Sequence, residues 1–129
     1  MKYLLDTHLL LWALLSPKRL SLKTRKLIAD ENNVLFFSVI SLWEVSIKTA
    51  AGRHDFQVNA KTFRRYLLDN GYTELLLNGG HAVAAGDLPL LHRDPFDRIL
   101  ITQATIEDII LLTSDKVVAQ YPAPIQLVS

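Results

Sequence analysis

The stretch YLLDTHLLLWALL, residues 3–15, joins a short apolar run to a longer one through a single acid, Asp6. The large apolar side chains of residues 3–5 are typical of a short buried strand. Residues 7–15 are predicted to form an apolar helix that ends at Ser16 and Pro17. Asp6 therefore follows a buried strand directly, where desolvation of a carboxylate costs several kcal/mol unless something compensates it.

The same alternation of strand and helix continues along the chain. Further strands are predicted at residues 34–37, 73–77 and 109–112, with an edge strand at 125–128. Helices are predicted at residues 21–29, 41–51, 59–69, around 81–85, 94–107 and 115–121, with Ser21, Ser41, Asn59 and Asp94 as caps. Apolar strands that alternate with helices indicate a mostly parallel sheet covered on both faces.

Composition narrows the class of protein. A chain of 129 residues with 50% hydrophobic residues fits a single domain, 1–129. The net charge of +1 gives no overall basic character, so any site for a polyanion must be local. The absence of cysteine excludes disulfides and thiolate metal sites. No uncharged stretch approaches the roughly 20 residues of a membrane span, so we expect a cytoplasmic protein.

Four acids lie next to or inside strongly apolar segments: Asp6, Glu44, Asp97 and Asp115. Asp6 and Asp115 follow predicted strands, whereas Glu44 and Asp97 lie about one turn into predicted helices. In open α/β sheets the functional crevice lies beyond the carboxyl ends of the strands. We therefore expect all four carboxylates to converge at one end of the sheet.

Carboxylates gathered in this way repel one another unless a cation compensates them. Mg²⁺ and Mn²⁺ prefer carboxylate oxygen and water as ligands. A metal held there lowers the pKa of a bound water and orients it for attack on a phosphodiester. The acids consequently predict metal-assisted hydrolysis.

Each acid also has a purely structural interpretation. Asp6 and Asp115 could cap the helices that follow them, and Asp94 and Asp97 could be a capping pair at the start of helix 94–107. For Asp94 the choice between cap and ligand stays open. Asp97 is instead expected to face the crevice, because apolar residues bury the part of the helix that follows it.

Glu44 could instead form a surface salt bridge with Lys48 at i+4. Ile40, Trp43 and Ile47 share the helix face of Glu44, so a surface pair is the weaker interpretation.

Four motifs together resemble those of PIN-domain ribonucleases, specifically the VapC-like toxins of type II toxin–antitoxin modules. They are YLLDTH at 3–8, SVISLWEVS at 38–46, HRDPFDR at 92–98 and LTSD at 112–115. The motifs occur in order and span nearly the whole chain.

This resemblance implies a three-layer α/β/α domain around a central, mostly parallel sheet of four to five strands. It also implies an endoribonuclease that depends on Mg²⁺ or Mn²⁺. The metal-site acids of the family correspond to Asp6, Glu44, Asp97 and Asp115. Asp94 occupies an additional acidic position, and the family's hydroxyl neighbours correspond to Thr7 and to either Thr113 or Ser114.

The resemblance further implies an RNA substrate, a cognate antitoxin protein and a toxin homodimer. Apolar positions around Leu9, Trp12 and Trp43 could form a groove for an amphipathic antitoxin segment. Large apolar residues are more often buried for packing, so core positions are the alternative.

Two histidines and two arginines lie near the acids. We expect His8 and His92 to make supporting hydrogen bonds rather than to bind the metal, because hard cations rarely use imidazole. Arg93 and Arg98 could hold RNA phosphates or simply balance nearby acids.

Rival functions remain open at this stage. A receiver or phosphatase-like domain is disfavoured, because the first strand ends in a single Asp rather than paired acids. A non-catalytic PIN-fold domain that binds RNA or protein is the main alternative. Action on DNA is another, since the metal chemistry can attack either backbone.

Overall fold

A five-stranded parallel sheet forms the centre of the protein. The computed structural model describes residues 1–128, and its strands are β1 (Lys2–Leu5), β2 (Val34–Ser38), β3 (Thr73–Leu75), β4 (Ile110–Thr113) and β5 (Ile125–Leu127). Their order across the sheet is β3-β2-β1-β4-β5, and every neighbouring pair is parallel. β1 is central, so the strand that carries Asp6 has neighbours on both sides.

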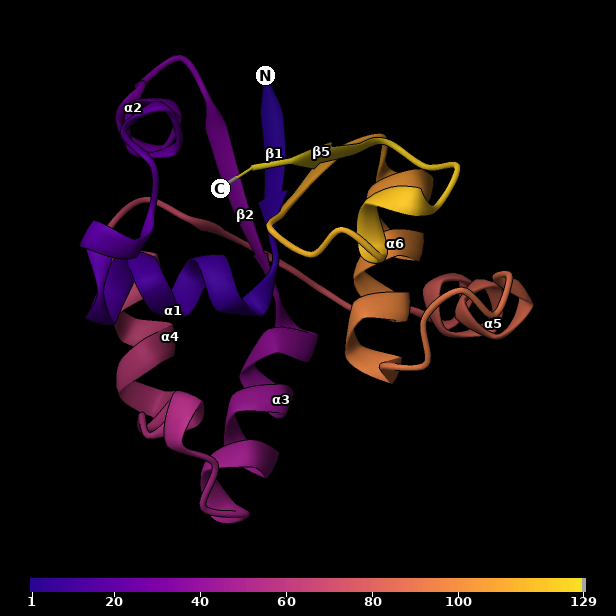
Figure 1. Ribbon diagram of the computed structural model, residues 1–129, viewed down its shortest axis with the longest axis horizontal. Helices are drawn as coiled ribbons and strands as arrows, with labels where there is room; N and C mark the ends of the chain where they lie inside the picture. Colours follow the sequence, from indigo (N-terminus) through magenta and orange to yellow (C-terminus); the bar gives the residue numbers. More distant parts are fainter. Residues whose placement is uncertain (129) are drawn as a thin grey trace.

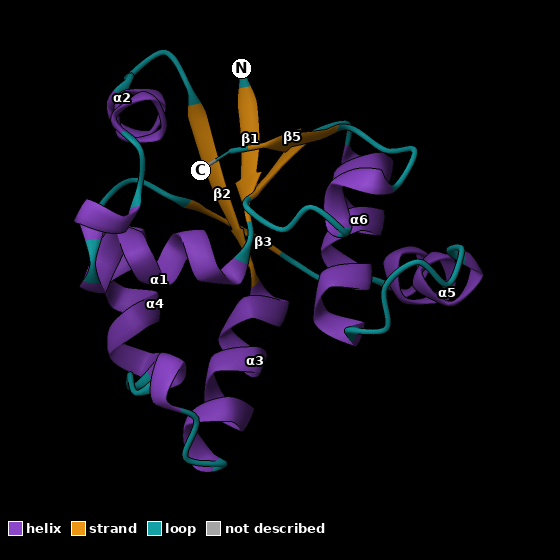
Figure 2. Ribbon diagram, in the orientation of Figure 1, coloured by secondary structure: helices purple, strands orange, loops and turns teal. Residues whose placement is uncertain are grey.

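Helices cover both faces of this sheet (Figures 1 and 2). They are α1 (Thr7–Leu15), α2 (Leu22–Ala29), α3 (Val39–Ala50), α4 (Ala60–Asp69), α5 (Gly79–Asp87) and α6 (Pro95–Glu107). In Figure 1, α1, α2 and α4 lie on one side of the strands and α5 and α6 on the other, while α3 extends beyond the end of β2. The predicted three-layer α/β/α architecture is confirmed.

Two apolar cores explain why the strands are apolar throughout. Tyr3 and Leu5 of β1 belong to the core beneath α1 and α4, which includes the fully buried Phe63. Leu4, between them, points into the opposite core beneath α6, with Leu100. Successive strand residues face opposite sides of a sheet, so a strand covered on both faces must be apolar at every position.

Three of the four predicted helix caps are confirmed, and one is wrong. Ser21, Asn59 and Asp94 are the N-caps of α2, α4 and α6. Ser41, however, lies in the first turn of α3, and Ser38 is the cap, whose hydroxyl accepts a hydrogen bond from the backbone N–H of Ile40 at 3.1 Å. β2 runs directly into α3, and this leaves no separate loop for Ser41 to close.

Three other elements differ from the prediction by more than one residue or in type. β3 ends at Leu75, which pairs with the last residue of β2. α5 is longer than residues 81–85 because Asn78 and His81 form a capping box at its start. The segment 115–121 is a turn followed by a 3-10 helix (Val118–Gln120) rather than an α-helix. Along residues 1–128, none of the helices is both long and apolar enough to span a membrane.

Candidate metal centre

All four predicted acids line one cleft beyond the carboxyl ends of the strands. The cleft has a volume of about 420 Å³, and its walls come from α1, α3, the start of α6 and the segment after β4. Its lining residues are Asp6, His8, Trp12, Glu44, Lys48, Arg53, His92, Asp94, Asp97, Ser114 and Asp115. The parallel topology thus gathers acids that are more than a hundred residues apart in the sequence.

Asp6 is both a helix cap and a wall of the cleft. One carboxylate oxygen accepts the backbone N–H of Leu9 at 2.9 Å, and the other accepts the hydroxyl of Thr113 at 2.6 Å. Only 6% of the residue is exposed, and this burial raises the pKa of Asp6 despite both hydrogen bonds. The cap and ligand interpretations are therefore compatible, because the two hydrogen bonds fix the carboxylate where it lines the cleft.

Glu44 is the acid whose surroundings best fit a cation. It is 2% exposed, and its Oε2 accepts a hydrogen bond from the Lys48 ammonium. Its Oε1 is buried and finds no hydrogen-bond partner among residues 1–128. A buried carboxylate oxygen without a partner is costly, and a divalent cation would remove that cost. The Glu44–Lys48 pair does form, but inside the cleft rather than on the surface.

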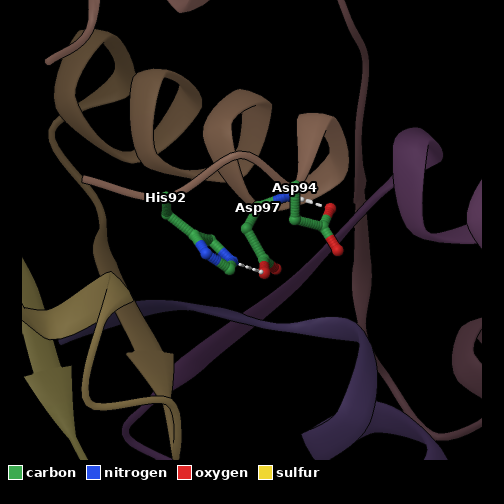
Figure 3. A group of neighbouring side chains, drawn as sticks. All are labelled: His92, Asp94 and Asp97. Carbon is green, nitrogen blue, oxygen red and sulfur yellow. Dashed lines mark hydrogen bonds and ion pairs between the residues drawn. The ribbon is translucent and has the colours of Figure 1, made fainter. Parts of the chain in front are cut away.

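Asp94, Asp97 and His92 form a compact group at the start of α6 (Figure 3). Their nearest ligand atoms all lie within 4.8 Å of one another. Asp94 is the cap of α6, accepting the backbone N–H groups of Phe96 at 2.9 Å and of Asp97 at 3.2 Å. His92 Nε2 shares a hydrogen bond of 2.8 Å with Asp97 Oδ2, so this imidazole has the supporting contact expected for it.

The surroundings of Asp97 in this group raise its pKa to about 7. The largest cause is burial, and the next is repulsion from the neighbouring Asp94 carboxylate. The hydrogen bond from His92 acts in the opposite direction. A carboxyl group that is buried beside another carboxylate favours its protonated form unless a cation compensates it.

Asp115 is the most open of the acids. Its Oδ1 accepts the backbone N–H groups of Val117 at 2.8 Å and Val118 at 3.3 Å. Its Oδ2 lies 4.0 Å from His92 Nε2, and 41% of its side chain is exposed. The two residues before Asp115 differ in role. The Thr113 hydroxyl donates to Asp6, whereas Ser114 lines the cleft.

The hydroxyl of Thr7 has a different partner. Its Oγ1 lies 2.8 Å from the hydroxyl of Ser41, and both residues are buried. This hydrogen bond joins the first turn of α1 to that of α3 beneath the cleft. Thr7 therefore connects the helix that Asp6 caps to the helix that carries Glu44.

The two predicted arginines have different surroundings. The Arg98 guanidinium donates to a set of backbone carbonyls, those of Ala85, Leu88, Pro89 and His92, at 2.8–3.2 Å. It also lies 3.3 Å from the hydroxyl of Tyr121. These bonds occupy Arg98 in holding the loop before α6, so it is not available to bind RNA phosphates. Arg93 is exposed.

Several residues have roles at the cleft that the sequence did not predict. Lys48 was identified only as a surface partner of Glu44, whereas its side chain is 16% exposed within the cleft. Arg53 has no local sequence signal, because tertiary packing alone brings it to the cleft. Of the apolar residues proposed for a groove, Leu9 is fully buried core, Trp12 lines the cleft and Trp43 is 60% exposed.

The fold and the cleft together define a class of protein. It is a parallel α/β domain in which buried carboxylates from separate elements face one crevice, a donor set suited to a hard divalent cation. The sequence pattern of the PIN domain matches residues 3–124, and the chain belongs to the PIN domain family. The resemblance recognised from the four motifs is confirmed at this level.

Several solved structures with the same fold come from VapBC systems. A chain in the crystal structure of VapBC2 from Rickettsia felis bound to a DNA fragment from their promoter is 18% identical, with a TM-score of 0.74 and complete coverage of both chains. VapBC-1 from nontypeable Haemophilus influenzae contains a chain that is 20% identical, with a TM-score of 0.62 and 98% coverage of each chain. VapBC-5 from Mycobacterium tuberculosis contains one that is 15% identical, with a TM-score of 0.61 and 98% and 97% coverage of this and that chain. No curated protein matches the sequence.

Proposed function

We propose that this protein is a Mg²⁺- or Mn²⁺-dependent endoribonuclease that hydrolyses RNA phosphodiester bonds. The observation that carries the proposal is the buried Oε1 of Glu44, which has no hydrogen-bond partner among residues 1–128 and lies in a cleft lined by four further carboxylates. Membership of the PIN family supports a nuclease. The choice of RNA over DNA rests on the resemblance of the four motifs to PIN-domain ribonucleases.

The residues proposed to hold the cation are Asp6, Glu44, Asp97 and Asp115, with Asp94 beside them. A bound cation of this kind supplies a water of lowered pKa and stabilises negative charge on the departing oxygen. The residues around these carboxylates fix their orientation. Thr113 holds Asp6, His92 holds Asp97, and backbone N–H groups hold Asp115. Such supporting hydrogen bonds keep ligand geometry ready for the cation.

We also propose that the protein is the toxin of a toxin–antitoxin pair, acting in the cytoplasm as a homodimer. The VapBC structures that share its fold support an antitoxin partner. Trp43 and Ile47, which are 60% and 39% exposed, give an apolar surface to α3, the helix that carries Glu44. An amphipathic partner segment would bury such a surface.

Cleavage of a mixed pool of structured RNAs by the purified protein tests the nuclease. Wild type should cut RNA with Mg²⁺ or Mn²⁺ and stop in EDTA. Asp6→Asn should remain folded and inactive, because it removes ligand charge with almost no change of volume. Asp69→Asn, at the exposed last residue of α4, is the matched control and should cut like wild type.

The outcomes separate the rival functions. Cutting by Asp6→Asn at the wild-type rate would contradict the assigned site. Equal cutting of single-stranded DNA of matched sequence would favour a nuclease that acts on DNA as well. Binding of Mn²⁺ and RNA without any cutting would favour the non-catalytic PIN-fold binding domain.

A further inference from the structure

Lys48 places a fixed positive charge inside the acidic cleft. Its ammonium bonds to Glu44 Oε2 and lies 3.9 Å from Asp94 Oδ2. Among the described side chains, the ion-pair partners of the cleft carboxylates are Lys48 and His92. Arg53, which also lines the cleft, is 3.3 Å from Asp55 instead. Lys48 is thus the permanent cation that compensates the cluster directly.

Aromatic rings hold this ammonium close to the acids. Lys48 Nζ lies 4.7 Å from the centre of the Phe56 ring and 5.5 Å from that of the Phe96 ring. Ring faces attract an ammonium, and more strongly where water is excluded. The side chain is only 16% exposed. Lys48 therefore has favourable contacts inside the cleft that do not involve Glu44.

A purely structural ion pair would leave the Glu44 carboxylate fully satisfied. Here one oxygen is bonded to Lys48, and the other is buried without a partner in the described part of the chain. One monovalent charge compensates only part of the charge of the five carboxylates that line the cleft. Lys48 therefore leaves part of the negative charge of the cleft uncompensated.

We propose that Lys48 is a built-in counter-ion which a divalent cation must displace from Glu44. This inference rests on the proposed function and deepens it. In the metal-free protein the ammonium neutralises Glu44 and keeps α3 folded around a buried charge. When the cation binds, the ammonium leaves Oε2 and stays in the cleft beside Asp94 and the two aromatic rings. Lys48 is in this sense a competitor of the cation that lowers the affinity of the site for metal.

Competition and structural support predict opposite effects of removing the ammonium. If Lys48 competes with the cation, its loss tightens metal binding, because like charges within a few ångströms repel strongly in a partly buried site. If Lys48 merely positions Glu44 for the metal, its loss weakens binding. Lys48→Met separates the two, since methionine keeps an unbranched apolar stem against Phe56 and Phe96.

The experiment is calorimetric titration of the metal-free protein with Mn²⁺, alongside thermal unfolding in EDTA. Lys48→Met should bind Mn²⁺ roughly ten-fold more tightly than wild type and should melt at a lower temperature in EDTA. Lys61→Met removes the same charge from an exposed position of α4 and should match wild type in both measurements. Lys48→Arg, which keeps the charge, should bind no more tightly than wild type.

Lys48→Met is also informative if it does not fold in EDTA. Circular dichroism should then show that added Mn²⁺ restores the fold, because the cation takes over the role of the missing ammonium. A variant that stays unfolded with Mn²⁺, or that binds Mn²⁺ as wild type does or less tightly, overturns the inference. The proposed function fails separately, if wild type itself binds no Mn²⁺ or does not cut RNA.

Discussion

Replacing Asp97 by asparagine should stabilise the metal-free protein at pH 8. Burial and the adjacent Asp94 charge raise the pKa of Asp97 from 3.8 to about 7. The folded protein therefore binds a proton more tightly than the unfolded chain, and ionisation of Asp97 at pH 8 costs stability. At about 1.36 kcal/mol for each unit, a shift of about three units corresponds to roughly 4 kcal/mol.

The measured gain should be smaller than this limit, because the amide replaces only part of the hydrogen bond that His92 makes with Asp97. We expect the free energy of unfolding of Asp97→Asn to exceed that of wild type by roughly 2–4 kcal/mol at pH 8 in EDTA. A raised pKa gives stability that is present at low pH and lost as pH rises through about 7. The advantage of the variant should accordingly shrink by about 2–3 kcal/mol on going from pH 8 to pH 5.

Urea unfolding of both proteins in EDTA at these two pH values gives the comparison. Asp69→Asn is the control for a generic loss of negative charge, and it should change the free energy of unfolding little at either pH. Mn²⁺ should stabilise wild type and not Asp97→Asn. The reasoning is refuted if Asp97→Asn is no more stable than wild type at pH 8, or if its advantage grows as the pH falls.

Three further changes test other parts of the structure. Thr113→Val removes the hydroxyl that holds Asp6 and should weaken Mn²⁺ binding by calorimetry about ten-fold or more, whereas Thr113→Ser should retain it. Arg98→Ala should cost about 2–3 kcal/mol in urea unfolding, because backbone carbonyls before α6 lose their donor, and Arg98→Lys should restore little of it. Burial raises the pKa of Tyr72 to about 12. The free energy of unfolding of wild type should therefore fall by about 2–3 kcal/mol as pH rises from 10 to 12, and that of Tyr72→Phe should fall less.

Local patterns predicted most of the fold. The apolar run of β1 and the caps at Ser21, Asn59 and Asp94 depend on residues close in sequence, and the structure confirms them. The prediction of Ser41 as the cap of α3 was wrong. Ser38 lies three residues before it and can also cap a helix, and only the length of β2 decides between the two. The direct passage from a strand into a helix leaves no loop residues to mark the boundary.

The convergence of the acids was predictable for a general reason. Parallel strands bring their carboxyl ends to one edge, so acids that follow such strands must meet there. The partners of these acids were less predictable. Lys48 follows Glu44 by one helical turn whether the pair is exposed or buried, and Arg98 bonds to carbonyls that carry no side-chain signature. Such contacts depend on the packing of α3, α5 and α6.

Anomalous diffraction from crystals grown with Mn²⁺ tests the central claim most directly. The expected result is an anomalous peak within coordination distance of Asp6, Glu44 and Asp97, with the Lys48 ammonium no longer bonded to Glu44 Oε2. A cleft without a peak at saturating Mn²⁺, with Lys48 still bonded to Glu44, would contradict both the metal centre and the exchange proposed for Lys48.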